Sequence, residues 1–171
     1  ACTTLGELLM TDGWPQKNPS TARAAFKAEC GKDHQPACVL WASMLLEGRA
    51  GKKDVAKAHE IFENACNKRN AKGCLQWGLI QEKKNVAKAF DLFDSACQGG
   101  ESKGCFQIGR LHESNRNQSL EIRTDKAKTA YLTACRANYL PACNALYRLG
   151  FTTDSERNAT YESNPSAFLD I

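Results

Sequence analysis

Eight of the nine cysteines in this 171-residue chain form four pairs with one common spacing. The second cysteine of each pair follows the first by eight positions, in Cys30/Cys38, Cys66/Cys74, Cys97/Cys105 and Cys135/Cys143. Residues eight apart in one continuous helix lie about 12 Å from each other, whereas a disulfide requires Cα atoms within about 7 Å. A disulfide within a pair therefore requires the chain to turn back between its two cysteines.

The residues between paired cysteines are typical of a helix end, because most of these segments contain Gly, Asn or Asp. They are Gly31-Lys32-Asp33, Asn67 to Asn70, Gln98-Gly99-Gly100 and Ala137-Asn138-Tyr139. We therefore predict that each pair forms a disulfide that clamps the corner between two consecutive helices.

Cysteine pairs of this kind persist as disulfides mainly outside the cytosol, which predicts a periplasmic or extracellular location. Zinc coordination is the alternative. The chain has three histidines and no C-x-x-C motif, so zinc ligands would have to come from different corners. We expect no metal site and no cofactor.

Cys2 has no partner at this spacing. It follows Ala1, as a cysteine follows a small residue at a bacterial lipoprotein cleavage site, and this predicts a lipid anchor. Alternatively, Cys2 occupies the second-cysteine position of a repeat and is merely unpaired.

Charge and hydropathy exclude two classes of partner. The net charge is +4, without the clustered Lys and Arg of a nucleic-acid-binding face. The longest apolar runs are far shorter than the roughly 20 residues that span a bilayer. A membrane contact is expected only through a lipid on Cys2.

Aligning the chain on the second cysteines reveals an internal repeat. Three positions later the residue is large and apolar, and one position after that it is small: Leu5-Gly6, Trp41-Ala42, Trp77-Gly78 and Ile108-Gly109. Such neighbours favour close packing of helices. Leu146-Tyr147 breaks the pattern, which predicts that the array ends there.

The first cysteines end a second pattern, that of an amphipathic helix. An aromatic residue lies four positions before the cysteine and an alanine eight positions before it: Ala22/Phe26, Ala58/Phe62, Ala89/Phe93 and Ala127/Tyr131. We expect these residues to face the core. The repeats differ in length, and the differences fall in the loop inside each repeat. This loop is short at residues 82–85 (EKKN) and long at residues 112–124 (HESNRNQSLEIRT).

These recurring positions resemble the Sel-one-like (Sel1-like) repeat family, and the cysteine pairs resemble its disulfide-rich branch, the Helicobacter cysteine-rich proteins. The resemblance covers residues 1–150, departs from the family pattern at Glu29 and in the short loop before Asn85, and leaves 151–171 as a non-repeat segment. It implies an all-α, right-handed αα solenoid of four to five TPR-like helix-pair repeats, stapled by disulfides. In that segment, Tyr161, Phe168, Leu169 and Ile171 are candidates for a cap on the last repeat or, equally, for binding in the groove of a neighbouring molecule.

The resemblance also implies an exported, non-enzymatic module that binds a protein partner through the concave face of its repeats. A narrower expectation is an immunity or inhibitor protein for a secreted effector enzyme. Relatives linked to penicillin binding and weak β-lactamase activity suggest the alternative function. The chain has no Ser-x-x-Lys motif, and its nearest approach to Lys-Thr-Gly is Lys128-Thr129-Ala130, so we predict that it is not an enzyme.

Candidate contact residues follow from the same resemblance, because the helices after the second cysteines line the inner surface in this family. The candidates for contact with a partner are Leu40, Met44, Gln76, Gln107 and Arg110. For the apolar members, Leu40 and Met44, burial between repeats is the favoured alternative. Trp14, in the loop GWPQKNP, either caps the first repeat or anchors a partner, as tryptophan often does at protein interfaces.

Overall fold

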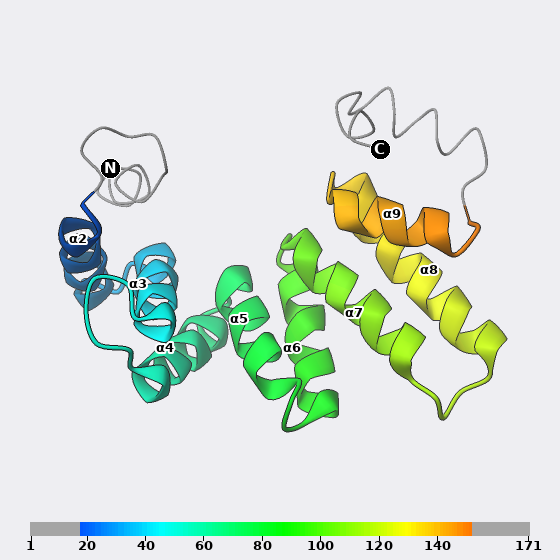
Figure 1. Cartoon of the computed structure of the whole chain (residues 1–171), viewed down its shortest axis with the longest axis horizontal. Helices are drawn as coiled ribbons and strands as arrows, with labels where there is room; N and C mark the ends of the chain where they lie inside the picture. Colours follow the sequence, from blue (N-terminus) through cyan, green and yellow to red (C-terminus); the bar gives the residue numbers. More distant parts are fainter. Residues whose placement is uncertain (1–17, 152–171) are drawn as a thin grey trace. The chain divides into compact units, whose positions relative to one another are not determined.

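The computed structural model describes residues 18–151, and within this range it contains eight α-helices and no β-strand (Figure 1). The helices are α2 (Pro19–Gly31), α3 (Gln35–Glu47), α4 (Val55–Asn67), α5 (Ala71–Gln81), α6 (Val86–Gln98), α7 (Ser102–Ser114), α8 (Leu120–Arg136) and α9 (Leu140–Arg148). The predicted all-α class is confirmed. Cys2, Trp14 and the segment after Phe151 lie outside the described residues, so the domain boundary near residue 150 stays a prediction.

The chain divides into two compact units at a point within α6, between Ala89 and Phe90. In the first unit, α2 packs on α3, α3 on α4 and α4 on α5, and α3 also contacts α5. In the second unit, α7 packs on α8 and α8 on α9. Contacts between helices adjacent in sequence are those expected of stacked helical repeats.

All four predicted disulfides are present, and each joins the last turn of one helix to the first turn of the next. They link α2 to α3, α4 to α5, α6 to α7 and α8 to α9, with Cα–Cα distances between 4.4 and 4.8 Å. Between the two helices of each pair lie three residues, 32–34, 68–70, 99–101 and 137–139. The cysteine pairs therefore clamp tight helix corners, as predicted.

Each corner has the same backbone geometry. The third residue after the first cysteine has a positive φ: Asp33 (66°), Arg69 (62°), Gly100 (87°) and Asn138 (60°). The next amide donates to a carbonyl five residues earlier, as Asn70 does to Ala65 at 2.9 Å. This left-handed helix end, a Schellman-type cap, turns the chain within a few residues.

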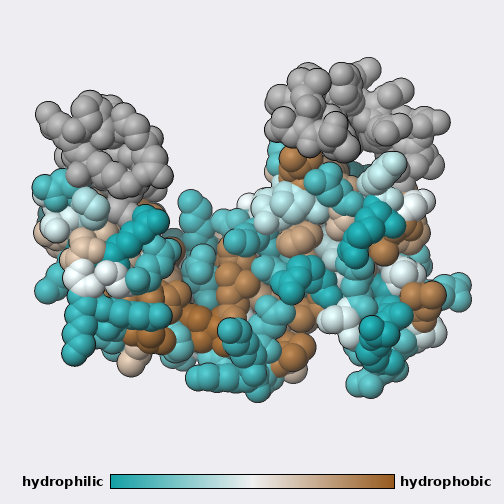
Figure 2. All heavy atoms as spheres, viewed as in Figure 1, coloured by the Kyte–Doolittle hydropathy of each residue, from teal (hydrophilic) through white to brown (hydrophobic). Residues whose placement is uncertain are grey.

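The predicted core face is confirmed. The four alanines, Ala22, Ala58, Ala89 and Ala127, are 0% exposed, and the aromatic residues four positions later, Phe26, Phe62, Phe93 and Tyr131, are at most 1% exposed. One set of buried residues centres on Phe26 and Met44 in the first unit, and another on Tyr131 and Leu146 in the second. The charged faces of these helices point to solvent, and Figure 2 shows hydrophilic residues over much of the visible face of the described chain.

The loop between α7 and α8 is shorter than predicted. Only residues 115–119 separate the two helices, because α8 begins at Leu120 and is 17 residues long. Ser119 caps this helix by accepting a hydrogen bond from the amide of Ile122 at 3.4 Å. The extra residues of this repeat therefore extend a helix, where we had expected a loop.

Candidate functional site

A groove of about 580 Å³ lies in the second unit, between α7, α8 and α9. We call it the arginine groove. Its principal lining residues are Phe106, Arg110 and Glu113 from α7, Tyr131 from α8, and Asn144 and Arg148 from α9. Three consecutive helices therefore contribute charged, polar and aromatic side chains to one surface.

The two arginines occupy equivalent positions in successive repeats. Arg110 follows the second cysteine of its corner by five positions, and Arg148 does the same in the next repeat. Because each disulfide fixes the start of its helix, the two guanidinium groups come from the same register. The equivalent residues in the first unit are Ser43 and Leu79, which carry no charge.

Glu113 holds Arg148 in the groove. Nη2 of Arg148 donates to both carboxylate oxygens of Glu113, at 2.9 Å each. The hydroxyl of the fully buried Tyr131 donates to Oε2 of the same carboxylate. Glu113 is therefore fixed from the core side and restrains an arginine on the outer side.

Arg110 is held in a similar way. Its Nη1 donates to Oε1 of Gln107, whose side chain is only 5% exposed. Gln107 is polar and yet buried. We infer that this buried amide serves to position the guanidinium group of Arg110, which is itself exposed.

The arginine groove holds a neutral phenol beside charged side chains. Burial, and then the hydrogen bond to Glu113, raise the pKa of Tyr131 far above its ordinary value of 10.0, so its hydroxyl stays neutral at physiological pH. Among the described lining residues, Arg110 and Arg148 carry positive charge and Glu113 carries negative charge.

Only part of the predicted contact set is accessible. Leu40 and Gln76 are half-buried, and Arg110 is exposed in the arginine groove. Met44 is 2% exposed and packs with Ala22 and Phe26. Met44 therefore belongs to the core, the alternative given for it above, because its helix turns that face toward α2.

Sequence reasoning missed Glu113, Tyr131 and Arg148 as groove residues. Arg148 could have been found, because it shares the register of Arg110. Glu113 was expected only as part of the loop at 112–124. In the structure, Glu113 pairs with Arg148, and the ring of His112 packs edge-on against Phe90 with 5.4 Å between centroids.

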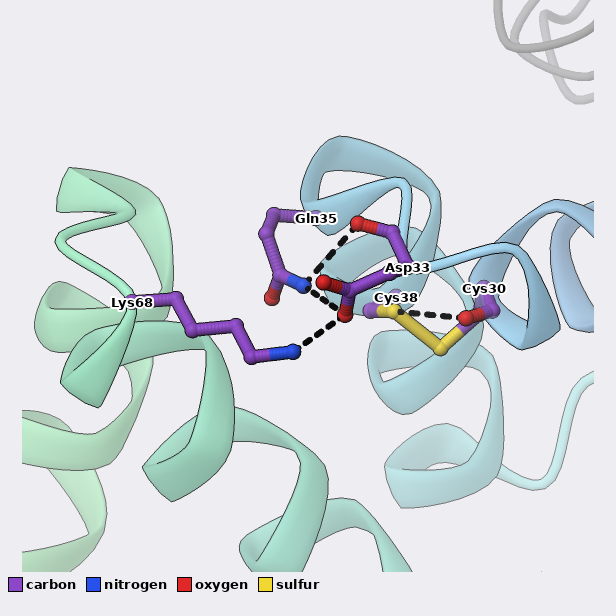
Figure 3. The surroundings of a disulfide bond; sticks show 5 residues. All are labelled: Cys30, Asp33, Gln35, Cys38 and Lys68. Carbon is purple, nitrogen blue, oxygen red and sulfur yellow. Dashed lines mark hydrogen bonds and ion pairs between the residues drawn. A yellow bond between two sulfur atoms is a disulfide. The ribbon is translucent and has the colours of Figure 1, made fainter.

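A second, smaller cavity lies beside the first disulfide and has a volume of about 200 Å³. Figure 3 shows Asp33 between Gln35 and Lys68 at this corner. Nε2 of Gln35 donates to Oδ1 of Asp33 at 2.7 Å, and Lys68, from the next corner, forms an ion pair with the same oxygen. Because both cysteines are in a disulfide, the cavity has no thiol for chemistry, and its side chains connect neighbouring repeats.

Within residues 18–151, no group of three or more His, Cys, Asp or Glu side chains is arranged to hold a metal ion. None of the helices in this range combines the length and the hydropathy that crossing a bilayer requires. Lys128-Thr129-Ala130 lies within α8, and Nζ of Lys128 is 4.6 Å from the ring centroid of Phe151.

Comparison with solved structures identifies the fold. The chain is similar to a Sel1 repeat protein from Oxalobacter formigenes, with a TM-score of 0.78 and 16% identity over 94% of this chain and 69% of that one. It is also similar to a protective antigen present in uropathogenic Escherichia coli strains that displays an SLR fold, with a TM-score of 0.72 and 16% identity over 97% of this chain and 37% of that one.

A third similar structure is an immunity protein from Pseudomonas aeruginosa, with a TM-score of 0.64 and 17% identity over 82% of this chain and 54% of that one. No family model matches the sequence, and no curated protein matches it. The chain spans 37% and 54% of the second and third structures. The similarities show that the chain has the fold of Sel1 repeat proteins, a solenoid of helix pairs, as the sequence predicted.

Proposed function

We propose that this chain is a non-enzymatic module, exported to an oxidising compartment, where it binds a protein partner. The observation that carries the proposal is the arginine groove, in which Gln107 and Glu113 hold two arginines in place on a disulfide-clamped scaffold. Fixing side chains before association lowers the entropic cost of binding. A surface prepared in this way is suited to recognition.

The four disulfides support the proposed compartment. Disulfides of this kind form in the periplasm or outside the cell and are rare in the reducing cytosol. Attachment to a membrane through a lipid on Cys2 remains a proposal of its own.

A narrower form of the proposal is that the partner is a secreted effector enzyme, which this chain neutralises. The similarity in fold to an immunity protein from Pseudomonas aeruginosa supports it. The corresponding test is whether stoichiometric amounts of the purified chain inhibit the activity of the captured partner. A partner that is not an effector, or that keeps its activity when bound, would rule out this narrower form.

Site-specific photo-crosslinking tests the general proposal. We would place a photoreactive amino acid at Asn144, an exposed residue that lines the groove, and, as a matched control, at Glu63, an exposed residue of α4. Irradiation in the native host should join one particular protein to the Asn144 probe and not to the Glu63 probe. Absence of an adduct at Asn144, or the same adducts at both positions, would contradict the proposal.

The enzymatic alternative has a direct test. Purified, oxidised chain should hydrolyse the chromogenic β-lactam nitrocefin no faster than buffer does. Turnover that scales with protein concentration and survives a metal chelator would favour the alternative, since it would demonstrate metal-independent catalysis of the serine β-lactamase type.

A further inference from the structure

We propose that the cavity beside the first disulfide binds a lysine side chain of the partner, with its ammonium group over the ring of Trp41 and against Glu60. This inference rests on the proposed function and adds a contact surface in the first unit to the arginine groove of the second. The lining of the cavity includes Trp41 from α3 and Lys57, Glu60, Ile61 and Asn64 from α4.

The next repeat of the chain shows how a site of this kind is filled. Trp41 and Trp77 each lie three positions after the second cysteine of a pair. Lys57 and Lys88 each lie nine positions before the first cysteine of the following pair. In the later repeat, Nζ of Lys88 is 4.3 Å from the ring centroid of Trp77, and Trp77 is 7% exposed. The chain's own lysine therefore occupies the face of Trp77 in a cation–π interaction.

In the earlier repeat, the equivalent lysine is turned aside. Nζ of Lys57 donates to both carboxylate oxygens of Glu60, at 2.8 and 2.9 Å. Among the described residues, no cation lies over the ring of Trp41, which is half-buried and lines the cavity. Asp91 occupies the position of Glu60 in the later repeat. Its side chain is one methylene group shorter, so its carboxylate reaches less far toward the lysine three positions before it.

The cavity has the size of a single side chain. Its volume of about 200 Å³ lies below the range of about 300–1,000 Å³ that is typical of pockets for whole small molecules. Ile61, which is 7% exposed, gives the lining an apolar part. Lysine packs its methylene groups on such surface while its ammonium group stays near polar atoms. A lysine side chain therefore matches both the size and the composition of the cavity.

Glu60 is able to exchange one ammonium group for another. The side chains of Lys57 and Glu60 are 43% and 68% exposed, and exposed ion pairs of this kind contribute little to stability. A lysine of the partner can therefore replace Lys57 on the carboxylate at small cost. Asp33 is different, because it is already bonded to Gln35 and Lys68 (Figure 3). We assign it no contact with the partner.

The test is a titration of the oxidised, full-length chain, followed by NMR of the tryptophan indole N–H groups. The chain has three tryptophans, and the W41F variant assigns the signal of Trp41. The ligand is a capped Gly-Lys-Gly peptide, and its control carries norleucine, which lacks the ammonium group, in place of lysine. The lysine peptide should shift the Trp41 signal and bind about fivefold or more tightly than the control. The signal of Trp77 should not move, because Lys88 already covers its ring.

Two variants at the surface should change this affinity in opposite directions. E60Q removes the carboxylate and should weaken binding of the lysine peptide by about fivefold, because a charge-assisted hydrogen bond is lost. K57A removes the competing ammonium group and should strengthen binding by about threefold. K83A is the matched control, since it removes an exposed lysine from the α5–α6 loop of the same unit. It should change the affinity by less than about twofold.

Three results would overturn the inference. They are equal binding of the lysine and norleucine peptides at Trp41, changes of the same sign for E60Q and K57A, and an effect of K83A as large as that of K57A. The proposed function has a separate outcome, because photo-crosslinking at Asn144 can identify a partner whether or not the cavity binds lysine. A crosslinked partner with a failed titration would remove only the inference about the cavity.

Discussion

Gly109 allows the ring of Tyr131 to lie directly against the backbone of α7. A Cβ atom at this position would be 2.3 Å from Cε1 and 2.5 Å from Cδ1 of Tyr131. Tyr131 is fully buried, and its hydroxyl is bonded to Glu113. The ring therefore cannot move aside without disturbing the carboxylate that holds Arg148. One small residue thus connects the packing of two helices to the geometry of the arginine groove.

Substituting Gly109 tests this contact. Gly109→Ala should lower the free energy of unfolding by about 2 kcal/mol, since overpacking costs about 1–3 kcal/mol and exceeds the gain of alanine in helix propensity. Urea denaturation of the oxidised protein measures it. Gly31→Ala is the matched control, because nothing lies within 4 Å of a Cβ at Gly31. Equal changes in the two variants would show that the contact with Tyr131 is not tight.

His112 gives the second unit a pH-dependent stability. Burial, and then the positive charge of Lys126, lower the pKa of His112 below its ordinary value of 6.5. The unfolded chain therefore binds more protons than the folded chain as pH falls through 6.5, and the free energy of unfolding decreases there.

We expect the unfolding temperature of the wild type to fall more than that of H112N when the pH is lowered from about 7.5 to about 5.5. Differential scanning calorimetry at the two pH values measures the difference. If H112N loses as much as the wild type, then His112 is not the group responsible.

The corner between two helices is the element that recurs most faithfully in this chain. Each corner combines a disulfide, three connecting residues and one residue with positive φ. At Arg69 that residue is not glycine, although a left-handed conformation costs a residue with a Cβ about 1–2 kcal/mol. In the corner between α6 and α7 the equivalent residue is Gly100, and glycine adopts a left-handed conformation without this cost.

Opposite substitutions at these two equivalent positions should have opposite effects. Arg69→Gly should raise the free energy of unfolding by up to about 1 kcal/mol, and Gly100→Ala should lower it by about 1 kcal/mol. Nothing lies within 4 Å of a Cβ at Gly100, so the second effect arises from the backbone alone. Thermal unfolding of the two variants would measure these changes. The explanation fails if both variants change stability in the same direction.

Removing one disulfide measures what a corner contributes. In the chain-entropy account, a closed loop of about nine residues stabilises the fold by about 2.5 kcal/mol. C66A/C74A should therefore lower the free energy of unfolding by about 2–3 kcal/mol, as measured by urea denaturation. C97A/C105A removes a disulfide with the same sequence separation, 8 residues, and should lower the free energy of unfolding by a similar amount. A loss below about 0.5 kcal/mol in either variant would contradict the account.

The helices and corners were predictable from sequence because their determinants are local and repeat in register. The spacing of eight between cysteines, and the alanine and aromatic positions before them, fixed the pairing and the buried face. The α7–α8 loop was mispredicted because its polar residues resemble a loop, although Ser119 caps a helix that starts five residues earlier than expected. The requirement for a small residue directly before each second cysteine was not predicted. The structure shows its cause, because Gly73 and Gly104 lie too close to the preceding helix to carry a Cβ.

At the scale of the whole molecule, the arginine groove was only partly predictable. Arg110 was a candidate because it lies on a helix expected to face a partner. Its partnership with Glu113 and Arg148 was not predicted, because the Glu113–Arg148 pair joins residues 35 positions apart. Such a contact depends on how α7 and α9 are placed, and no repeated position marks Glu113. The contact predictions for Leu40 and Gln76 stay predictions. The contact predicted for Trp14 and the lipid anchor predicted at Cys2 concern residues outside the described range.

Disulfide mapping tests the central claim, that each cysteine pair clamps one helix corner and so fixes the surface offered to a partner. Trypsin cleaves between the two cysteines of every pair, after Lys32, Lys68, Lys103 and Arg136. Mass spectrometry of the unreduced digest should therefore find four linked peptide pairs, joining Cys30 to Cys38, Cys66 to Cys74, Cys97 to Cys105 and Cys135 to Cys143, each separating on reduction. Free thiols at these eight cysteines, or links between different corners, would contradict the claim.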